Sequence, residues 1–342
     1  MTLHITRDIT CCVSLFSLCL IFFITSSCNK YSVHALQTQF FKTAPSPKQG
    51  DLFGLYSKQK VLQLFKLDPL PAPVGPPVSP YPFETGTQLA SIDTRNELFY
   101  VLALNRTNHA VDLIGISLRS GQMIRKVTLD GLFSNFGYAQ TMSVDPNTGD
   151  VFIVSPLSSL EYALSLLKVS FQGNQSNVTL LNNNIYAQVG IYCCSLSAFE
   201  SKTLIVSLHV PFSGDYLFSF DRLTGKLLNR VLNSRQLQTL AYDSKTGMIV
   251  GMGYNEKYKR AMIYLDSNTL EVKKTIDIEG EYRDLLSGGS IDVVNRKWYG
   301  FMSKQGTTPP RFDLVTIDMD TGNVVNAINL EQRPESLLVF NE

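Results

Sequence analysis

The stretch Thr141-Met-Ser-Val-Asp145-Pro-Asn-Thr-Gly149-Asp-Val-Phe-Ile-Val-Ser155 contains the pattern that most of the chain repeats. An alternating run ends at Asp145, and the following Pro-Asn-Thr-Gly supplies the residues that a tight reversal of the backbone needs. An apolar, β-branched run leaves the turn. The pattern predicts a strand, a tight turn and a second strand.

The same frame recurs along the chain. The position of Asp145 is occupied in order by Asp93, Asp145, Ser197, Asp243, Asp292 and Asn341. The successive spacings are 52, 52, 46, 49 and 49 residues. The copy at Asp292 lacks the small turn residue, and the copy at Asn341 contains only the first half of the frame. A repeat of this kind is read as an array of similar structural units.

A second recurring element lies between these copies. It consists of a strand, a turn near glycine and another strand, and it occupies residues 116–127, 220–231, 265–272 and 317–325. Together the two elements give four short strands in each period of about fifty residues. That is the sequence signature of a β-propeller blade.

The two ends of the chain complement each other. Residues 52–57 and 61–66 predict two strands, and the proline-rich residues 69–77 belong on an outer edge or in a loop, because proline cannot donate to a ladder. This first unit lacks an opening strand, which residues 336–340 can supply. We therefore predict an all-β fold, a six-bladed β-propeller of four-stranded blades whose ring is closed by the C-terminal strand.

The strand-Asp-turn-Gly-strand units resemble those of the Tyr-Val-Thr-Asn, NHL and gluconolactonase-like propeller groups. The resemblance covers residues 50–342 at the level of architecture and rests on generic motifs. Gluconolactonase-like enzymes hold a metal through carboxylates and an asparagine in the central channel, and their motifs do not match this sequence.

Composition limits the classes of partner. The net charge is +1 and 17% of the residues are charged, so nothing favours nucleic acid, and none is expected. The chain is 44% hydrophobic, enough for a substantial core.

The N-terminus predicts export. Residues 1–28 have a short polar start, an apolar run of 13 residues from Cys12 to Ile24 and small residues before Cys28, as in a signal peptide. The run is shorter than the twenty or so residues of a membrane span, so no stable span is expected after its removal. We expect residues 29–50 to be a leader, residues 51–342 to be the propeller domain, and the protein to be secreted or extracellular. A lipid anchor through Cys28 is the alternative.

Three sequons, Asn105-Arg-Thr, Asn174-Gln-Ser and Asn177-Val-Thr, fall in predicted turns, and glycosylation of at least one is expected in a secretory protein. Adjacent Cys193 and Cys194 should point to opposite faces of a strand. Two small buried thiols are favoured over a vicinal disulfide.

Catalytic chemistry is weakly represented. Each frame aspartate directly precedes a turn, where aspartate normally caps backbone N–H groups. His34, His109 and His209 lack the spacing of metal ligands. The acidic run 277–284 lacks the spacing of a calcium loop, so a solvated loop is expected. No cofactor or metal is predicted.

One polar constellation recurs five residues before every frame position: Gln88, Gln140, Tyr192, Gln238, Ser287 and Ser336. Because the opening strand of a blade is innermost, these side chains are predicted to ring one mouth of the central channel. The alternative is that they pair with neighbouring backbone or bind channel water. Loops on the same face carry aromatic residues and an arginine: Phe133, Phe136, Tyr138, Tyr186, Tyr254, Tyr258, Tyr282 and Arg283.

We predict that the six ring residues, with Tyr138, Tyr282 and Arg283, bind a ligand. The sequence favours a secreted, non-catalytic propeller that binds a protein or glycan through its loop face and channel mouth. The alternative is a metal-dependent hydrolase or lactonase of the gluconolactonase-like type.

Overall fold

The computed structural model describes residues 45–58, 61–67, 71–78, 83–105, 110–129, 141–156, 164–173, 175–183, 193–199, 202–210, 214–285, 289–304, 306, 311–330 and 336–341. Residues Pro45–Glu342 form one compact unit. The predicted signal peptide, Cys28 and the leader up to residue 44 lie outside the described residues.

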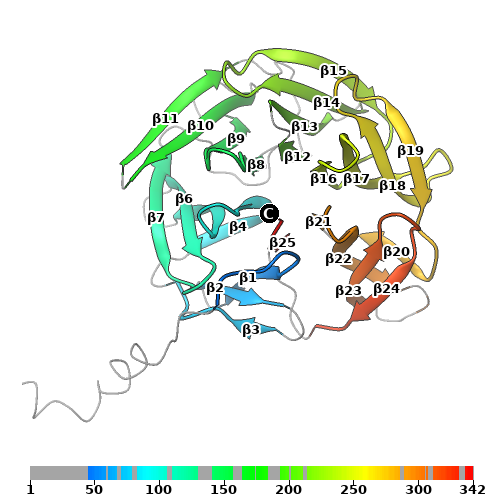
Figure 1. Ribbon diagram of the computed structural model, residues 1–342, viewed down its shortest axis with the longest axis horizontal. Helices are drawn as coiled ribbons and strands as arrows, with labels where there is room; N and C mark the ends of the chain where they lie inside the picture. Colours follow the sequence, from blue (N-terminus) through cyan, green and yellow to red (C-terminus); the bar gives the residue numbers. More distant parts are fainter. Residues whose placement is uncertain are drawn as a thin grey trace, which may run out of the picture. The chain divides into compact units, whose positions relative to one another are not determined.

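Six antiparallel sheets make up the compact unit, and they are arranged around a common centre (Figure 1). The described residues contain strands and turns but no helix. The predicted all-β, six-bladed propeller is confirmed. Here the sheets are called blades 1 to 6 in chain order, and strand 1 of each blade is the innermost.

The first three blades contain twelve strands. Blade 1 consists of β25 (Ser336–Val339), β1 (Leu52–Lys58), β2 (Val61–Lys66) and β3 (Ala72–Pro73). Blade 2 consists of β4 (Phe83–Asp93), β5 (Leu98–Asn105), β6 (Ala110–Ser117) and β7 (Met123–Leu129). Blade 3 consists of β8 (Thr141–Val144), β9 (Val151–Pro156), β10 (Leu164–Gln172) and β11 (Gln175–Asn182).

The last three blades contain thirteen strands, because the innermost strand of blade 6 is split into two pieces that both pair with the second strand. Blade 4 consists of β12 (Cys193–Phe199), β13 (Thr203–Val210), β14 (Gly214–Asp221) and β15 (Leu227–Asn233). Blade 5 consists of β16 (Thr239–Asp243), β17 (Met248–Tyr254), β18 (Arg260–Asp266) and β19 (Val272–Asp277). Blade 6 consists of β20 (Tyr282–Leu285), β21 (Ser290–Asp292), β22 (Lys297–Lys304), β23 (Arg311–Asp318) and β24 (Val324–Ile328).

The ring closes between the two ends of the chain, as predicted. Strand β25 pairs with β1 in antiparallel register, from Leu52 opposite Val339 to Leu55 opposite Ser336. Blades 1 and 6 share a buried cluster that includes Leu337 of β25 and Phe301 of β22. The proline-rich segment contributes β3 at the outer edge of blade 1, where a missing N–H donor costs least.

Both faces of the middle strands are buried, because each blade packs on two neighbours. In β5, Leu98, Tyr100 and Leu102 pack toward blade 3. The alternate residues Phe99 and Val101 pack toward blade 1. A strand buried on two sides reads as a continuous apolar run rather than an alternating one.

Trp298, the one tryptophan of the chain, is fully buried between blades 5 and 6. Its Nε1 donates to Thr239 Oγ1 at 3.0 Å. A Cβ at Gly289 would lie 2.6 Å from the indole, and one at Gly300 would lie 2.1 Å from it. The indole therefore packs directly against the backbone at Gly289 and Gly300, and its fluorescence reports on the packing of these two blades.

The turns between strands 1 and 2 share one backbone conformation. The fifth residue, counted from the frame aspartate, has a positive φ: 52° at Glu97, 74° at Gly149, 70° at Gly247 and 57° at Arg296. Glu97 and Arg296 are the two non-glycine residues among these four that adopt the less favourable left-handed conformation, and the side chain of each forms an ion pair. Glu97 Oε1 accepts from Arg119 Nη2 at 2.7 Å, and Arg296 belongs to a larger network.

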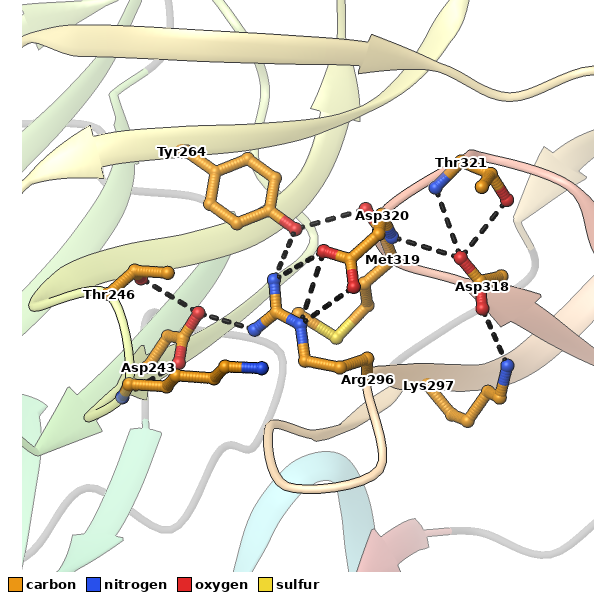
Figure 2. A network of polar contacts seen from close by, with 10 residues as sticks. Asp243, Thr246, Tyr264, Arg296, Lys297, Asp318, Met319, Asp320 and Thr321 are labelled. Carbon is orange, nitrogen blue, oxygen red and sulfur yellow. Dashed lines mark hydrogen bonds and ion pairs between the residues drawn. The ribbon is translucent and has the colours of Figure 1, made fainter.

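Arg296 joins blades 5 and 6 (Figure 2). Its guanidinium donates to Asp243 Oδ2 in blade 5, to Asp320 Oδ1 in blade 6 at 2.8 Å and to the Tyr264 hydroxyl at 3.2 Å. The Tyr264 hydroxyl in turn donates to the Met319 carbonyl at 3.0 Å. Burial raises the pKa of Tyr264 to about 12, so this donor keeps its proton.

Two glycines allow blade 1 to approach the outer turn of blade 2. A Cβ at Gly121 would lie 1.5 Å from the Val74 carbonyl oxygen, and one at Gly75 would lie 1.6 Å from that of Ser120. Both glycines have positive φ, 66° and 73°. A side chain at either position would separate the two segments.

Several sequence expectations differ from the structure. Tyr254, which the sequence places on a loop, is the last residue of β17, and the acidic run 277–284 includes the end of β19 and most of β20. The sequence predicts a turn at Asn177, but this residue lies within β11, which begins at Gln175, and Asn174 lies outside the described residues. Tyr282 and Arg283 lie in β20 rather than in a loop, because this stretch pairs with β22. The end of the predicted leader contacts the ring: the Gly50 N–H donates to the Phe340 carbonyl at 2.9 Å.

Acid should destabilise the outer turns between strands 3 and 4. Asp221, Asp266 and Asp318 open three of these turns. The pKa of Asp221 is lowered by hydrogen bonds from Thr224, that of Asp266 by backbone N–H groups of residues 269 and 268, and that of Asp318 by Lys297 and then by Thr321. A carboxylate whose pKa is lower in the folded state than in the unfolded state stabilises the fold at pH values above its unfolded-state pKa of about 3.9. This stabilisation is lost as the pH falls through the folded-state pKa.

We therefore expect the thermal midpoint, followed by Trp298 fluorescence, to fall as the pH drops below about 4. A variant with asparagine at Asp221, Asp266 and Asp318 should lose less of its midpoint over the same interval. An identical acid slope in the variant would contradict this role of the three carboxylates.

Candidate functional site

The two faces of the propeller have different connections. Because consecutive strands are antiparallel, the turns between strands 1 and 2 and between strands 3 and 4 share one face, called here the turn face; its inner turns include residues 94–97, 146–150, 244–247 and 293–296. The opposite loop face carries the strand 2–3 turns and the connections between blades. Its described part includes residues 234–238, 255–259 and 278–281.

The frame aspartates on the turn face serve the structure. Asp93, Asp145, Asp243 and Asp292 are each at most 1% exposed. Asp145 Oδ1 accepts from the Asn147 N–H at 2.9 Å, and Asp292 Oδ1 accepts from the Asn295 N–H at 2.8 Å. These contacts are the turn caps that the sequence predicted.

In Asp145 and Asp243 the Oδ2 atom binds an arginine of the next blade, whereas in Asp93 and Asp292 it accepts from an asparagine of the same turn. Asp145 Oδ2 in blade 3 accepts from Arg222 Nη1 of blade 4 at 2.8 Å. Arg95 of blade 2 donates to the Asn147 carbonyl of blade 3 at 2.7 Å. Turn capping and blade contacts thus occupy the aspartates that could have been taken for catalytic groups.

The loop face of blade 5 carries a stacked polar cluster at the start of its innermost strand. The Arg260 guanidinium lies over the Tyr254 ring, with Cζ 4.0 Å from the ring centroid. Arg260 Nη1 also donates to Gln238 Oε1 at 2.6 Å. Arg260 is 8% exposed, and Gln238 and Tyr254 are half-buried. A cation held over an aromatic ring and by an amide is fixed in position.

The turn after this cluster is held rigidly by Asn255. Its Oδ1 accepts from the backbone N–H groups of Lys257 at 2.8 Å and Lys259 at 2.9 Å. Its Nδ2 donates to Asp277 Oδ1 at 2.7 Å. The Asn255 N–H closes the turn on the Lys259 carbonyl at 2.8 Å. An asparagine that makes these bonds presets the backbone of the turn.

Tyr258 stands at the tip of this turn. Its side chain is 80% exposed, and its φ of 55° lies in the left-handed region. The exposed Lys257 and Lys259 flank it. A left-handed non-glycine residue costs about 1 to 3 kcal/mol, and such residues gather at functional sites. The turn therefore presents an aromatic ring between two positive charges.

The predicted ring residues are described to different extents. Gln238 is the ring position whose side chain the structure describes, and it pairs with Arg260. Gln88 lies in β4 and Ser336 begins β25, but only their backbones are described. The other ring positions, Gln140, Tyr192 and Ser287, lie outside the described residues, as does Tyr138. Convergence of the six side chains stays a prediction.

Tyr282 has a structural contact inside blade 6. Its side chain is 9% exposed, and its hydroxyl donates to Asp313 Oδ2 at 2.9 Å. Asn329 Nδ2 donates to the other oxygen of this carboxylate at 3.2 Å. Asp313 is 2% exposed, so a buried charge is held by two donors.

Sequence reasoning included Tyr254 and Tyr258 among the loop aromatics but missed Arg260 and Asn255. A signal was present, since Asn255-Glu-Lys-Tyr-Lys-Arg260 is a short polar run between two apolar strands. The described residues include no cluster of three or more metal-ligating side chains. They also include no helix long and apolar enough to cross a membrane.

No known family model matches the sequence, and no curated protein does either. Solved structures do share the fold. TolB from Acinetobacter baumannii has a TM-score of 0.56 at 14% identity, over 86% of this chain and 68% of that chain. A prolyl endopeptidase has a TM-score of 0.52 at 14% identity, over 87% of this chain and 45% of that chain. Hydrazine synthase from Kuenenia stuttgartiensis has a TM-score of 0.51 at 10% identity, over 82% of this chain and 84% of that chain. Such identities establish a shared fold and no shared activity.

Proposed function

We propose that this protein is a secreted, non-catalytic β-propeller that binds a protein or glycan through its loop face. A propeller scaffold suits a binding role in general, and the ligand must be inferred from the site. The observation that carries the proposal is the exposed, left-handed Tyr258 on its rigid turn. An aromatic ring that contributes little to the core, at a backbone position that costs stability, is best explained by contact with a partner.

The neighbouring cluster extends this surface toward the channel. Gln238 immediately precedes the innermost strand of blade 5 and is fixed by Arg260. The ring hypothesis adds Gln88, Gln140, Tyr192, Ser287 and Ser336 around the same mouth. A ligand that reached from Tyr258 toward the channel would meet an aromatic edge first and polar groups below it.

Replacement of Tyr258 tests the proposal. The secreted full chain should be screened on an immobilised glycan panel and against a mixture of extracellular proteins, and the hits measured by surface plasmon resonance. Tyr258→Gly relieves the backbone strain and removes the ring, so we expect unchanged or slightly higher stability and at least about a tenfold loss of affinity. Ile124→Ser, at an exposed site on β7, is the matched control and should bind normally.

Undiminished binding by Tyr258→Gly would remove the turn from the site. The affinity of Gln238→Ala for the same ligand then distinguishes two places for the site. A loss of about 1 to 3 kcal/mol, the cost of a buried hydrogen-bond partner left unpaired, indicates binding at the channel mouth, and unchanged affinity indicates binding at the outer blades. A stoichiometric, tightly bound divalent ion in the purified protein would instead favour the hydrolase or lactonase alternative.

A further inference from the structure

Strand β11 is an exposed outer edge of blade 3. The six residues 175–180 are all exposed, among them Val178 at 41% and Leu180 at 47%. The unpaired edge of a long strand is a template for pairing with another chain, and natural sheets block it with charges, proline or short length.

The other outer strands use those devices. Strand β3 has two residues and includes Pro73, while β7 carries Arg125 and Lys126. Strand β19 carries Lys273 and Lys274, and β15 carries one arginine. Three outer strands carry no charged residue, β3, β11 and β24, but β3 has only two residues and β24 only five. The eight uncharged residues of β11 are the exception that needs another form of protection.

The sequon Asn177-Val-Thr179 lies in the middle of this strand. Asn177 and Thr179 are two residues apart, so they point to the same face, and they stand opposite Ser170 and Lys168 of β10. That face is polar, since Lys168 Nζ pairs with Asp150 Oδ2 at 2.7 Å. Val178 and Leu180 point the other way, opposite the buried Val169 and Leu167.

We propose that Asn177 carries an N-linked glycan that prevents edge-to-edge association through β11. The inference rests on the export that is part of the proposed function. A lipid-linked oligosaccharide pyrophosphate of the secretory pathway supplies the sugar. A bond forms between the Asn177 side-chain nitrogen and the anomeric carbon, the sugar–phosphate bond breaks, the amide loses one proton, and the lipid pyrophosphate leaves.

The geometry explains why one glycan suffices. Paired strands approach to about 4.8 Å, so a second molecule that docked on β11 would have to come within that distance of Asn177. A bulky, hydrated oligosaccharide at the centre of an eight-residue strand fills that space. Glycosylation here replaces the charges that β7, β15 and β19 use.

The test uses the full chain expressed in a eukaryotic secreting host. Recovery from the medium with a processed N-terminus reports export, and peptide mapping after enzymatic deglycosylation reports which asparagine was modified. Asn177→Gln and Thr179→Ala both destroy this sequon, whereas Ser176→Ala destroys only the sequon at Asn174. Light scattering after size-exclusion chromatography reports the oligomeric state.

We expect modified Asn177 in the wild type and a monomer for wild type and Ser176→Ala. Asn177→Gln and Thr179→Ala should at least double in apparent mass as concentration rises, and adding Leu180→Lys should restore the monomer. Exported protein with unmodified Asn177 would overturn the inference and leave the proposed function standing. Sequon variants that stay monomeric at every concentration would also overturn it, and a chain retained in the cell would count against the proposed export instead.

Discussion

Deletion of residues 336–342 should abolish folding. Strand β25 supplies strand 1 of blade 1, and without it β1 becomes an open edge. Leu337, Val339 and Phe340 are at most 6% exposed. Each buried side chain of this size contributes about 1.5 to 3 kcal/mol, and their sum is comparable to the 5–15 kcal/mol that holds an ordinary domain together.

The truncated chain should give no cooperative thermal transition, and its Trp298 emission should shift to that of an exposed indole. Removal of Glu342 alone is the control and should leave the transition in place. Addition of a synthetic peptide of residues 334–342 should restore part of the signal if the remaining blades retain their structure. A truncated protein that is soluble and melts cooperatively would show that the ring does not depend on this closure.

Replacement of Arg296 should strongly destabilise the contact between blades 5 and 6. Asp243 is fully buried, and Arg296 is its ion-pair partner from the next blade (Figure 2). Removal of one partner from a buried ion pair typically costs about 3 to 5 kcal/mol, because the other charge is left in a low dielectric. Asp243 keeps the Thr246 hydroxyl and the Lys245 N–H, so we expect the lower end of this range for Arg296→Met.

Urea unfolding followed by Trp298 fluorescence measures this loss. The double variant Arg296→Met with Asp243→Asn should recover part of the stability, because the uncompensated charge is then gone. Arg119→Met is the matched control, since its ion pair with Glu97 is exposed to solvent, and exposed pairs contribute far less to stability than buried ones. A loss no larger in Arg296→Met than in Arg119→Met would contradict the buried role of Arg296.

The repeat, the number of blades and the closure of the ring could all be predicted from the amino-acid sequence. These features depend on local chemistry, because Asp145 with Pro-Asn-Thr-Gly149 favours a turn through its own side chains and backbone, and the apolar, β-branched runs around it favour strands. The aspartates were correctly interpreted as turn caps for the same reason, since Asp145 binds the N–H two residues later. Closure of the ring could be predicted by counting strands, because the N-terminal unit lacks an opening strand and the C-terminus supplies one.

The contacts that the frame residues make beyond their own turns could not be predicted from the sequence and are visible in the folded protein. In the sequence, Arg296 stands in the frame copy that lacks the small turn residue, and nothing there indicates a partner. In the structure it bridges Asp243 and Asp320, which are 53 and 24 residues away. The same holds for Asn255, which fixes the turn that presents Tyr258, and for Arg260, which stacks on Tyr254. Such contacts depend on how neighbouring strands and blades are brought together, and a repeat pattern specifies the strands without specifying which side chains meet between them.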